Sequence, residues 1–168
     1  MPFRRGGLVP VPERKTLKAI LSELVEYVGE HVDIDRVFDI AEKAEELPDI
    51  ENRVYPTQKR RKKVRIGVAS DEAFSCYNPD NVDLLEAYGA ETVFFSPIHD
   101  KGLPPDLDGL YFTGGFPDML AEQLTQNQAI MKKIRDSAYD GMPIYSEQGG
   151  SLYLTESITD FGGSTFSM

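Results

Sequence analysis

The chain has 168 residues, of which 40% are hydrophobic, so it can form one globular domain with a small additional segment. Its formal net charge is −10, and residues 64–168 carry 16 acidic but only five basic side chains. Because non-specific binding to nucleic acid needs a basic surface, this composition argues against a nucleic-acid partner. No stretch approaches 18 apolar residues, and the basic N-terminus lacks the apolar segment of a secretory signal, so we expect no membrane partner.

Cys76 is the only cysteine of the chain, which excludes an intrachain disulfide and a zinc site built from several cysteines. This cysteine usage is typical of a reducing compartment, and we expect a cytoplasmic protein. Cys76 lies in a loop before a predicted helix, without a histidine close to it in sequence. The pattern therefore favours a small buried or half-buried residue over a reactive thiol.

The first part of the chain predicts an arm and a helix. Residues 1–15 are rich in Gly, Pro and Arg and would form a flexible arm on their own. From Thr16 to Val28 the apolar residues recur at helical spacing on one stripe, and Gly29 is suited to end this helix.

A second, shorter helix and a linker follow. The helix is predicted for Asp35–Glu46, with Asp33 or Asp35 as its N-cap. Its expected buried face consists of Val37, Phe38, Ala41 and Ala44. Residues 48–63 read as an interdomain linker whose basic run, residues 59–63, we interpret as a solvated segment before an acidic domain.

The rest of the chain alternates strands and helices, which predicts an α/β domain with a parallel sheet and right-handed crossovers. The four predicted strands are Val64–Ala69, Glu91–Phe95, Gly109–Thr113 and Pro143–Tyr145. The predicted helices begin at Pro79, Pro117 and Gln128. In the first of them, Asn78 is the expected N-cap, and Val82, Leu85 and Tyr88 form the expected core face. No further strand is predicted after Leu154.

The stretch from Pro143 to Leu154 has the layout of a nucleophile elbow. An apolar strand runs into polar residues, then two glycines, then a helix-like segment. The apex side chain of such a turn should be Gln148. Glu147 comes directly before the apex, so its side chain should point away from it. Ligands of parallel sheets bind at the carboxyl ends of the strands, and this turn lies at such an end.

Two other strand ends carry candidate site residues. Asp71 and Glu72 follow the first strand, and their carboxylates could bind a metal, act as acid and base, or cap the loop and the next helix, of which we favour capping. Gly114 and Gly115 follow the third strand. Their N–H groups could form an oxyanion hole, or the turn could require glycine for its backbone geometry alone.

These motifs resemble a known family. Residues 146–154 (Ser-Glu-Gln-Gly-Gly-Ser-Leu-Tyr-Leu) are similar to the glutaminase elbow of the cobyrinate a,c-diamide synthases, which are class I glutamine amidotransferases. Residues 71–74 (Asp-Glu-Ala-Phe), 94–97 (Phe-Phe-Ser-Pro) and 109–117 (Gly-Leu-Tyr-Phe-Thr-Gly-Gly-Phe-Pro) resemble three further stretches, in the family's order and with similar spacing. The resemblance spans residues 64–154.

The resemblance implies a flavodoxin-like domain of the class I glutamine amidotransferase type over residues 64–168, incomplete at its C-terminus and preceded by two helices. Residues 1–47 would be the tail of an ATP-binding domain, and residues 48–63 the linker. The implied partner is the ATP-binding amidoligase domain, and the implied substrates are glutamine and a tetrapyrrole. ATP and Mg would be bound only by that domain, because the chain has no phosphate loop. We expect no cofactor and no metal on this chain.

One departure from the family affects the mechanism. The resemblance places the nucleophile at Gln148 and the oxyanion hole at Gly114, Gly115 and Gly149, but the family has cysteine where this chain has Gln148. The family's catalytic histidine would lie beyond the last residue, so His31 and His99 are interpreted as surface residues. The chain would thus be the glutamine amidotransferase part of an ATP-dependent synthase that amidates corrinoid acetate side chains, without its nucleophile. The alternatives are a non-catalytic fragment that at most binds a partner, and part of a nickel-sirohydrochlorin a,c-diamide synthase.

Overall fold

The computed structural model describes residues 3–4, 7–8, 17–46, 48, 54–56, 61–160 and 162–168. The chain separates into two compact units, Met1–Asn52 and Arg53–Met168. The predicted arm and the predicted linker lie largely outside the described residues. The assignment of the first unit to the tail of an ATP-binding domain stays a prediction.

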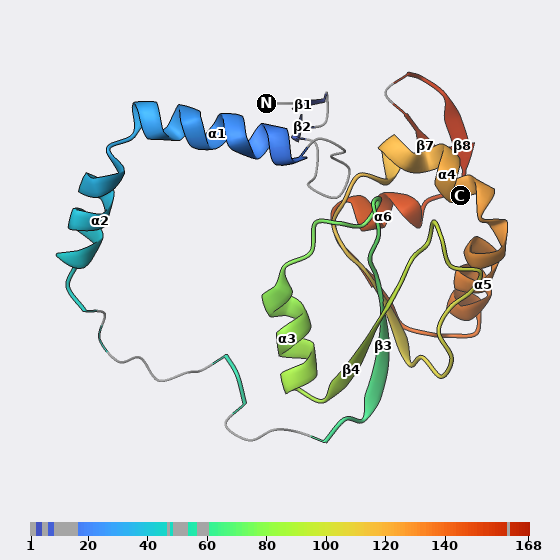
Figure 1. Cartoon of the computed structure of the whole chain (residues 1–168). Helices are drawn as coiled ribbons and strands as arrows, with labels where there is room; N and C mark the ends of the chain where they lie inside the picture. The colour runs from blue at the N-terminus through green and yellow to red at the C-terminus, as the bar shows by residue number, and fades with distance from the viewer. Residues whose placement is uncertain are drawn as a thin grey trace. The chain divides into compact units, whose positions relative to one another are not determined.

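The described part of the first unit forms a short hairpin and two helices (Figure 1). Strands β1 (Phe3–Arg4) and β2 (Gly7–Leu8) pair antiparallel. Helix α1 spans Leu17–His31 and continues through Gly29, where the sequence predicted its end. The last turn is tied to the turn before it, because the His31 ring stacks on Tyr27 and its Nδ1 lies 2.8 Å from the Tyr27 carbonyl oxygen.

Helix α2 spans Ile34–Glu42 and ends before Glu46, the predicted boundary. Asp33 caps it, because its carboxylate accepts a hydrogen bond from the Arg36 N–H at 2.9 Å. The predicted burial of its apolar face is wrong: none of its residues is buried, and Phe38 is 65% exposed. An amphipathic helix buries its stripe only against another surface, and the described part of this unit leaves that stripe exposed.

The second unit is built on a four-stranded parallel sheet in the order β4-β3-β5-β6. The strands are β3 (Val64–Ala69), β4 (Ala90–Phe95), β5 (Gly109–Phe112) and β6 (Ile144–Ser146). All four residues of β5 are buried, as expected for an inner parallel strand covered on both faces. The predicted α/β architecture with a parallel sheet is confirmed.

Helices cover both faces of this sheet (Figure 1). Helix α3 (Pro79–Ala87) lies on one face, while α4 (Ala121–Gln126) and α5 (Gln128–Tyr139) lie on the other, where their apolar residues join the main core. A 3-10 turn, η2 (Pro117–Leu120), leads into α4. These crossovers place the carboxyl ends of all four strands at one edge of the sheet.

Helix α3 begins where the sequence predicted. It ends at Ala87, one residue before Tyr88, which was expected to complete its core face. The Asn78 side chain accepts a hydrogen bond from the Asp80 N–H at 3.1 Å, and Pro79 is the first helical residue. Tyr88, predicted to face the core, is the C-cap and is 50% exposed. Its hydroxyl donates to the Val54 carbonyl at 3.1 Å, which holds the ring outside the core. Gly89, with φ 102°, then turns the chain into β4.

An aromatic cluster lies under the carboxyl ends of the strands. The Phe112 ring is at its centre, with its centroid 5.9 Å from those of Phe74 and Phe95 and 5.6 Å from that of Tyr153. Phe74 and Phe112 are fully buried. Fully burying such a side chain contributes about 1.5–3 kcal/mol, so this cluster anchors the loops that follow β3, β5 and β6.

The residues after helix α6 (Gly149–Tyr153) form a hairpin that the sequence did not predict. Strands β7 (Ser157–Thr159) and β8 (Thr165–Ser167) pair antiparallel. Each strand has only three residues, too few to show an alternating pattern in the sequence. Ile158, the middle residue of β7, is buried and joins the main core. None of the helices in the described part of the chain combines the length and apolar character that crossing a bilayer requires.

Candidate functional site

The elbow predicted between Pro143 and Leu154 is present as a strand, a tight turn and a helix. Strand β6 leads through Glu147 to Gln148, and helix α6 spans Gly149–Tyr153. Gln148 has φ 48° and ψ −125°, a conformation that side-chain-bearing residues rarely adopt. Among the described residues, Asp106 is the only other non-glycine residue with a positive φ. The apex of the turn is therefore strained at the residue where the sequence placed it.

Backbone hydrogen bonds on both sides of the apex hold this conformation. The Glu147 N–H donates to the Phe112 carbonyl at 3.1 Å, which continues the pairing of β6 with β5. The Gly150 N–H donates to the Glu147 carbonyl at 2.9 Å, and the Ser151 N–H donates to the Gln148 carbonyl at 3.1 Å. Residues held in such sparsely populated backbone regions store about 1–3 kcal/mol, and they persist only where the surroundings fix them.

Three glycines permit close backbone contacts around the elbow. Gly149 and Gly150 approach the end of β5 and the turn after it, and Gly115, within that turn, approaches the loop after β3. A Cβ atom on Gly150 would lie 2.5 Å from the Phe112 carbonyl oxygen, and one on Gly149 would lie 2.8 Å from the Gly115 carbonyl carbon. A Cβ on Gly115 would lie 2.9 Å from the Phe74 Cα. None of the three glycines has a positive φ, so close approach, not backbone conformation, requires glycine at these positions.

Within the part of the chain that the structure describes, two backbone N–H groups beside the apex have no acceptor. Gly149 is the first residue of α6, where an N–H has no partner within the helix. In the described part of the chain, no hydrogen bond involves the Gly115 N–H, whereas the neighbouring Phe116 N–H donates to the Ala73 carbonyl at 2.9 Å. Gly114 uses its carbonyl to accept the Cys76 N–H at 2.9 Å. The structure thus brings the three predicted oxyanion-hole glycines next to Gln148.

Glu147 binds a tyrosine that sequence reasoning did not single out. The Tyr111 hydroxyl donates to the Glu147 carboxylate at 2.5 Å, and the Asn81 side chain donates to the same hydroxyl at 3.4 Å. Burial, together with the neighbouring Glu147 carboxylate, raises the pKa of Tyr111, so the hydroxyl remains a donor. This network connects α3, β5 and the residue before the apex, and no local motif of the sequence signals it.

Asp71 is a loop cap, as favoured from the sequence. One carboxylate oxygen accepts from the N–H groups of Ala73 and Phe74 at 2.8 and 3.2 Å. The other accepts from the Ser96 hydroxyl at 2.8 Å and from the Ile98 N–H at 3.0 Å. With both oxygens engaged, Asp71 fixes the two loops after β3 and β4. Nowhere in the described ranges do three or more His, Cys, Asp or Glu side chains gather as a metal site would require.

Each histidine has a partner within its own unit. His99 lies 2.9 Å from the Glu72 carboxylate, and both side chains are largely exposed. A hydrogen bond from the backbone and then the His99 ring lower the pKa of Glu72 below its usual value. His31 belongs to the first unit, where it stacks on Tyr27. Both histidines therefore fit the predicted role of surface residues.

Cys76 differs from its prediction. The thiol-bearing residue is exposed, not buried or half-buried. Cys76 and Gly114 form an isolated antiparallel bridge, which fixes the backbone of Cys76 at the sheet edge and leaves its side chain toward solvent. The bridge joins residues far apart in sequence, so the sequence pattern around Cys76 gives no sign of it.

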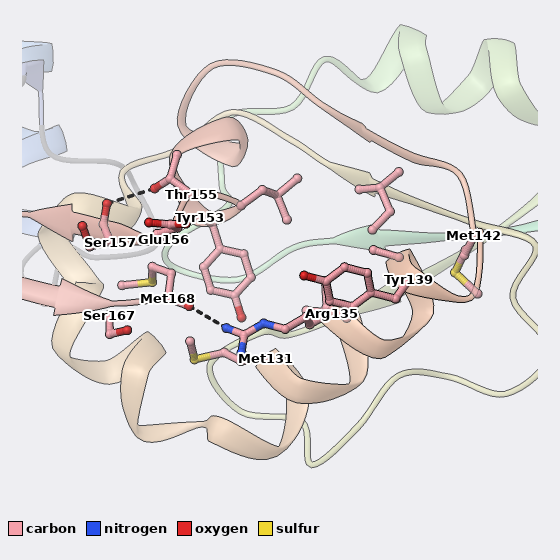
Figure 2. A pocket seen from close by; sticks show the side chains of 14 residues that line it. Met131, Arg135, Tyr139, Met142, Tyr153, Thr155, Glu156, Ser157, Ser167 and Met168 are labelled. Carbon is pink, nitrogen blue, oxygen red and sulfur yellow. Dashed lines mark hydrogen bonds between the residues drawn. The ribbon is translucent and has the colours of Figure 1, made fainter.

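A cavity of about 940 Å³ opens between α5, α6 and the β7–β8 hairpin (Figure 2). In Figure 2 the Arg135 guanidinium reaches the Met168 carbonyl, to which it donates at 2.8 Å. Tyr153 also lines this cavity, and within the described residues its buried hydroxyl has no hydrogen-bond partner. Burial and the Asp71 charge raise the pKa of Tyr153. Neither Gln148 nor the glycines beside it line the cavity, so it is separate from the apex of the elbow.

Comparison with known proteins agrees with this geometry. Residues 65–168 match the family of CobB/CobQ-like glutamine amidotransferase domains. Cobyrinate a,c-diamide synthases from Dehalococcoides mccartyi strain 195 and Archaeoglobus fulgidus are 40% and 43% identical, over 100% and 94% of this chain. Another from Methanosarcina acetivorans is 43% identical over 94% of the chain.

The chain spans about a third of the length of these relatives, 36%, 34% and 33% respectively. A solved structure, PurLQS from Thermotoga maritima, matches 55% of this chain and 43% of its own with a TM-score of 0.43 and 23% identity, which is too distant to inform the site. The family match covers residues 65–168, which include the four-stranded sheet except for Val64 and contain the whole elbow. The chain therefore belongs to the family of CobB/CobQ-like glutamine amidotransferase domains.

Proposed function

We propose that this chain is the glutamine amidotransferase part of a cobyrinate a,c-diamide synthase whose elbow no longer supplies a nucleophile. The observation that carries the proposal is Gln148 at the strained apex between β6 and α6. The lone pair of a carboxamide nitrogen is delocalised into its carbonyl, so it cannot attack the amide carbon of glutamine as a thiolate does. Cysteine, the residue that the family resemblance implies for this position, is absent from the elbow.

The rest of the elbow supports descent from a working glutaminase. The N–H groups of Gly115 and Gly149 would point at the oxygen of a bound amide, which is the role of an oxyanion hole. The relatives are named cobyrinate a,c-diamide synthases, which supports a corrinoid as the final acceptor of the amide nitrogen. With the nucleophile absent, the chain would act through binding to its partner, and free ammonia would replace glutamine as the nitrogen source.

The chain's own residues do not fit an ATP site. The sequence has no phosphate-binding loop, and the described residues form no cluster of metal-ligating side chains. We therefore assign ATP and Mg²⁺ to an ATP-binding amidoligase domain, which is the proposed partner. That domain would activate the carboxylate, and this chain would contribute no group to that step.

The direct test is the release of glutamate from L-glutamine by the purified chain. We expect no release above a control without protein, because the attacking group is missing. The Dehalococcoides mccartyi relative, assayed beside it, shows whether the conditions support turnover. Sustained glutamate release by the wild-type chain would overturn the proposal, provided that Gln148→Gly abolishes it, which excludes a contaminating glutaminase.

A second variant tests how much of the machinery is lost. Gln148→Cys restores a thiol at the apex but no general base, because His99, the histidine of the second unit, is held by Glu72. Partners in such triads act together, so one member alone restores little activity. We expect an electrophilic glutamine analogue to label this variant slowly, without steady turnover. Steady turnover would contradict this expectation and identify His99 as the base.

A further inference from the structure

The side chain of Gln148 lies over Gly114. Its carboxamide carbon, Cδ, is 3.2 Å from the position that a Cβ on Gly114 would take, and its oxygen Oε1 is the nearest atom to that position. Gly114 has no side chain, so the elbow's own amide fills the space that the glycine leaves. Gln148 is exposed, so this space lies at the surface, where a free amino acid could reach it.

This space lies beside the place where the proposed site would need the amide of its substrate. A glutaminase must bring the substrate amide carbon next to the elbow side chain and the amide oxygen next to backbone N–H groups. The Gly115 N–H, adjacent to Gly114, is without an acceptor among the described residues. The Gln148 carboxamide is chemically the same group as the end of a glutamine substrate.

We propose that the Gln148 side chain, which lies over Gly114 next to the Gly115 N–H, blocks the access of free glutamine to this elbow. The inference rests on the proposed function and concerns the access of glutamine to the same site, because a side chain of the chain itself fills the space beside the predicted oxyanion hole. A tethered group competes at an effective concentration of roughly millimolar or more. If the site is open only about a tenth of the time, the apparent affinity for glutamine falls about tenfold.

The test compares L-glutamine binding by three forms of the full chain, measured by calorimetry and by ligand-observed NMR. Gln148→Gly removes the side chain and suits the positive φ, so it should fold. Gln148→Met keeps the length of the side chain and the same unfavourable φ, and serves as the matched control. D-Glutamine is the control for specificity.

We expect saturable binding of L-glutamine by Gln148→Gly, at least about tenfold tighter than by the wild type. Gln148→Met should bind as weakly as the wild type, because its side chain still fills the space over Gly114. Equal binding by wild type and Gln148→Gly, or no binding by Gln148→Gly, would overturn the inference. Tight binding by Gln148→Met would also refute it, since occupancy would then not be the cause.

The outcomes separate this inference from the proposed function. Glutamine binding by the wild-type chain as tight as that by Gln148→Gly, without glutamate release, would overturn the inference alone. Glutamate release by the wild-type chain would overturn the proposed function, whatever the binding data show.

Discussion

Replacing Gln148 with glycine should stabilise the second unit, although it removes a whole side chain. The wild-type residue is held at φ 48° and ψ −125°, which costs about 1–3 kcal/mol for a residue with a Cβ. Glycine adopts such a conformation without strain. The unfolded glycine variant has more conformational entropy than the wild type, however, and this offsets about 0.4–1 kcal/mol of the gain. The exposed side chain of Gln148 buries little surface that could be lost. The net expectation is a gain of about 1 kcal/mol.

The assay is urea unfolding followed by circular dichroism, supported by calorimetric melting. A gain of about 1 kcal/mol corresponds to an increase in Tm of about 3–5 °C for a unit of this size. Gln148→Ala is the control that keeps the strain, since alanine also has a Cβ, and it should not gain stability.

A second control uses Asp106, which also has a positive φ, at 57°. Aspartate tolerates the left-handed region better than glutamine does, so Asp106→Gly should gain less. The reasoning is refuted if Gln148→Gly is less stable than the wild type, or if Gln148→Ala gains as much as Gln148→Gly.

Two further substitutions test how the elbow is held. Tyr111→Phe removes the donor to the Glu147 carboxylate. We expect a loss of about 1–3 kcal/mol in the free energy of unfolding, because a half-buried charge loses its hydrogen bond. A Tm within about 1 °C of the wild-type value would argue against this role. Gly115→Ala should leave little soluble protein, since its Cβ would overlap the backbone after β3, whereas Gly102→Ala, with open space around its Cβ, should express normally. Equal expression of the two alanine variants would contradict the close approach at Gly115.

The strands of the sheet were predictable because each signal is local. Val64–Ala69 was predicted without error, since a buried parallel strand reads as an apolar run between polar ends. Asn78 and Pro79 marked the start of α3 for the same reason, because a cap acts within a few residues of its own position. Sequence therefore located the strands of the parallel sheet and the apex of the elbow, but not the order of the strands.

The errors have a different physical origin. Cys76 was expected inside the protein, but its place is decided by a bridge to Gly114, which lies on another strand end. Tyr111 and Glu147 are 36 residues apart, and their hydrogen bond exists only once β5 and β6 are paired. Gly29 was expected to end α1, but glycine inside a helix is only about 1 kcal/mol less favourable than alanine, and the pairing of His31 with Tyr27 extends the helix past it.

The geometry of the elbow is independent of the side chain at its apex. The backbone around Gln148 is fixed by the hydrogen bonds of Glu147 and by the close approach of Gly149 and Gly150 to the turn after β5. None of these contacts uses a side-chain atom of Gln148, so an exchange of the apex residue leaves the turn in place. Fold and chemistry are thus carried by different residues here: changes at Gln148 alter what the site can bind, whereas changes at Gly115, Gly149 or Gly150 disrupt the packing that forms the site.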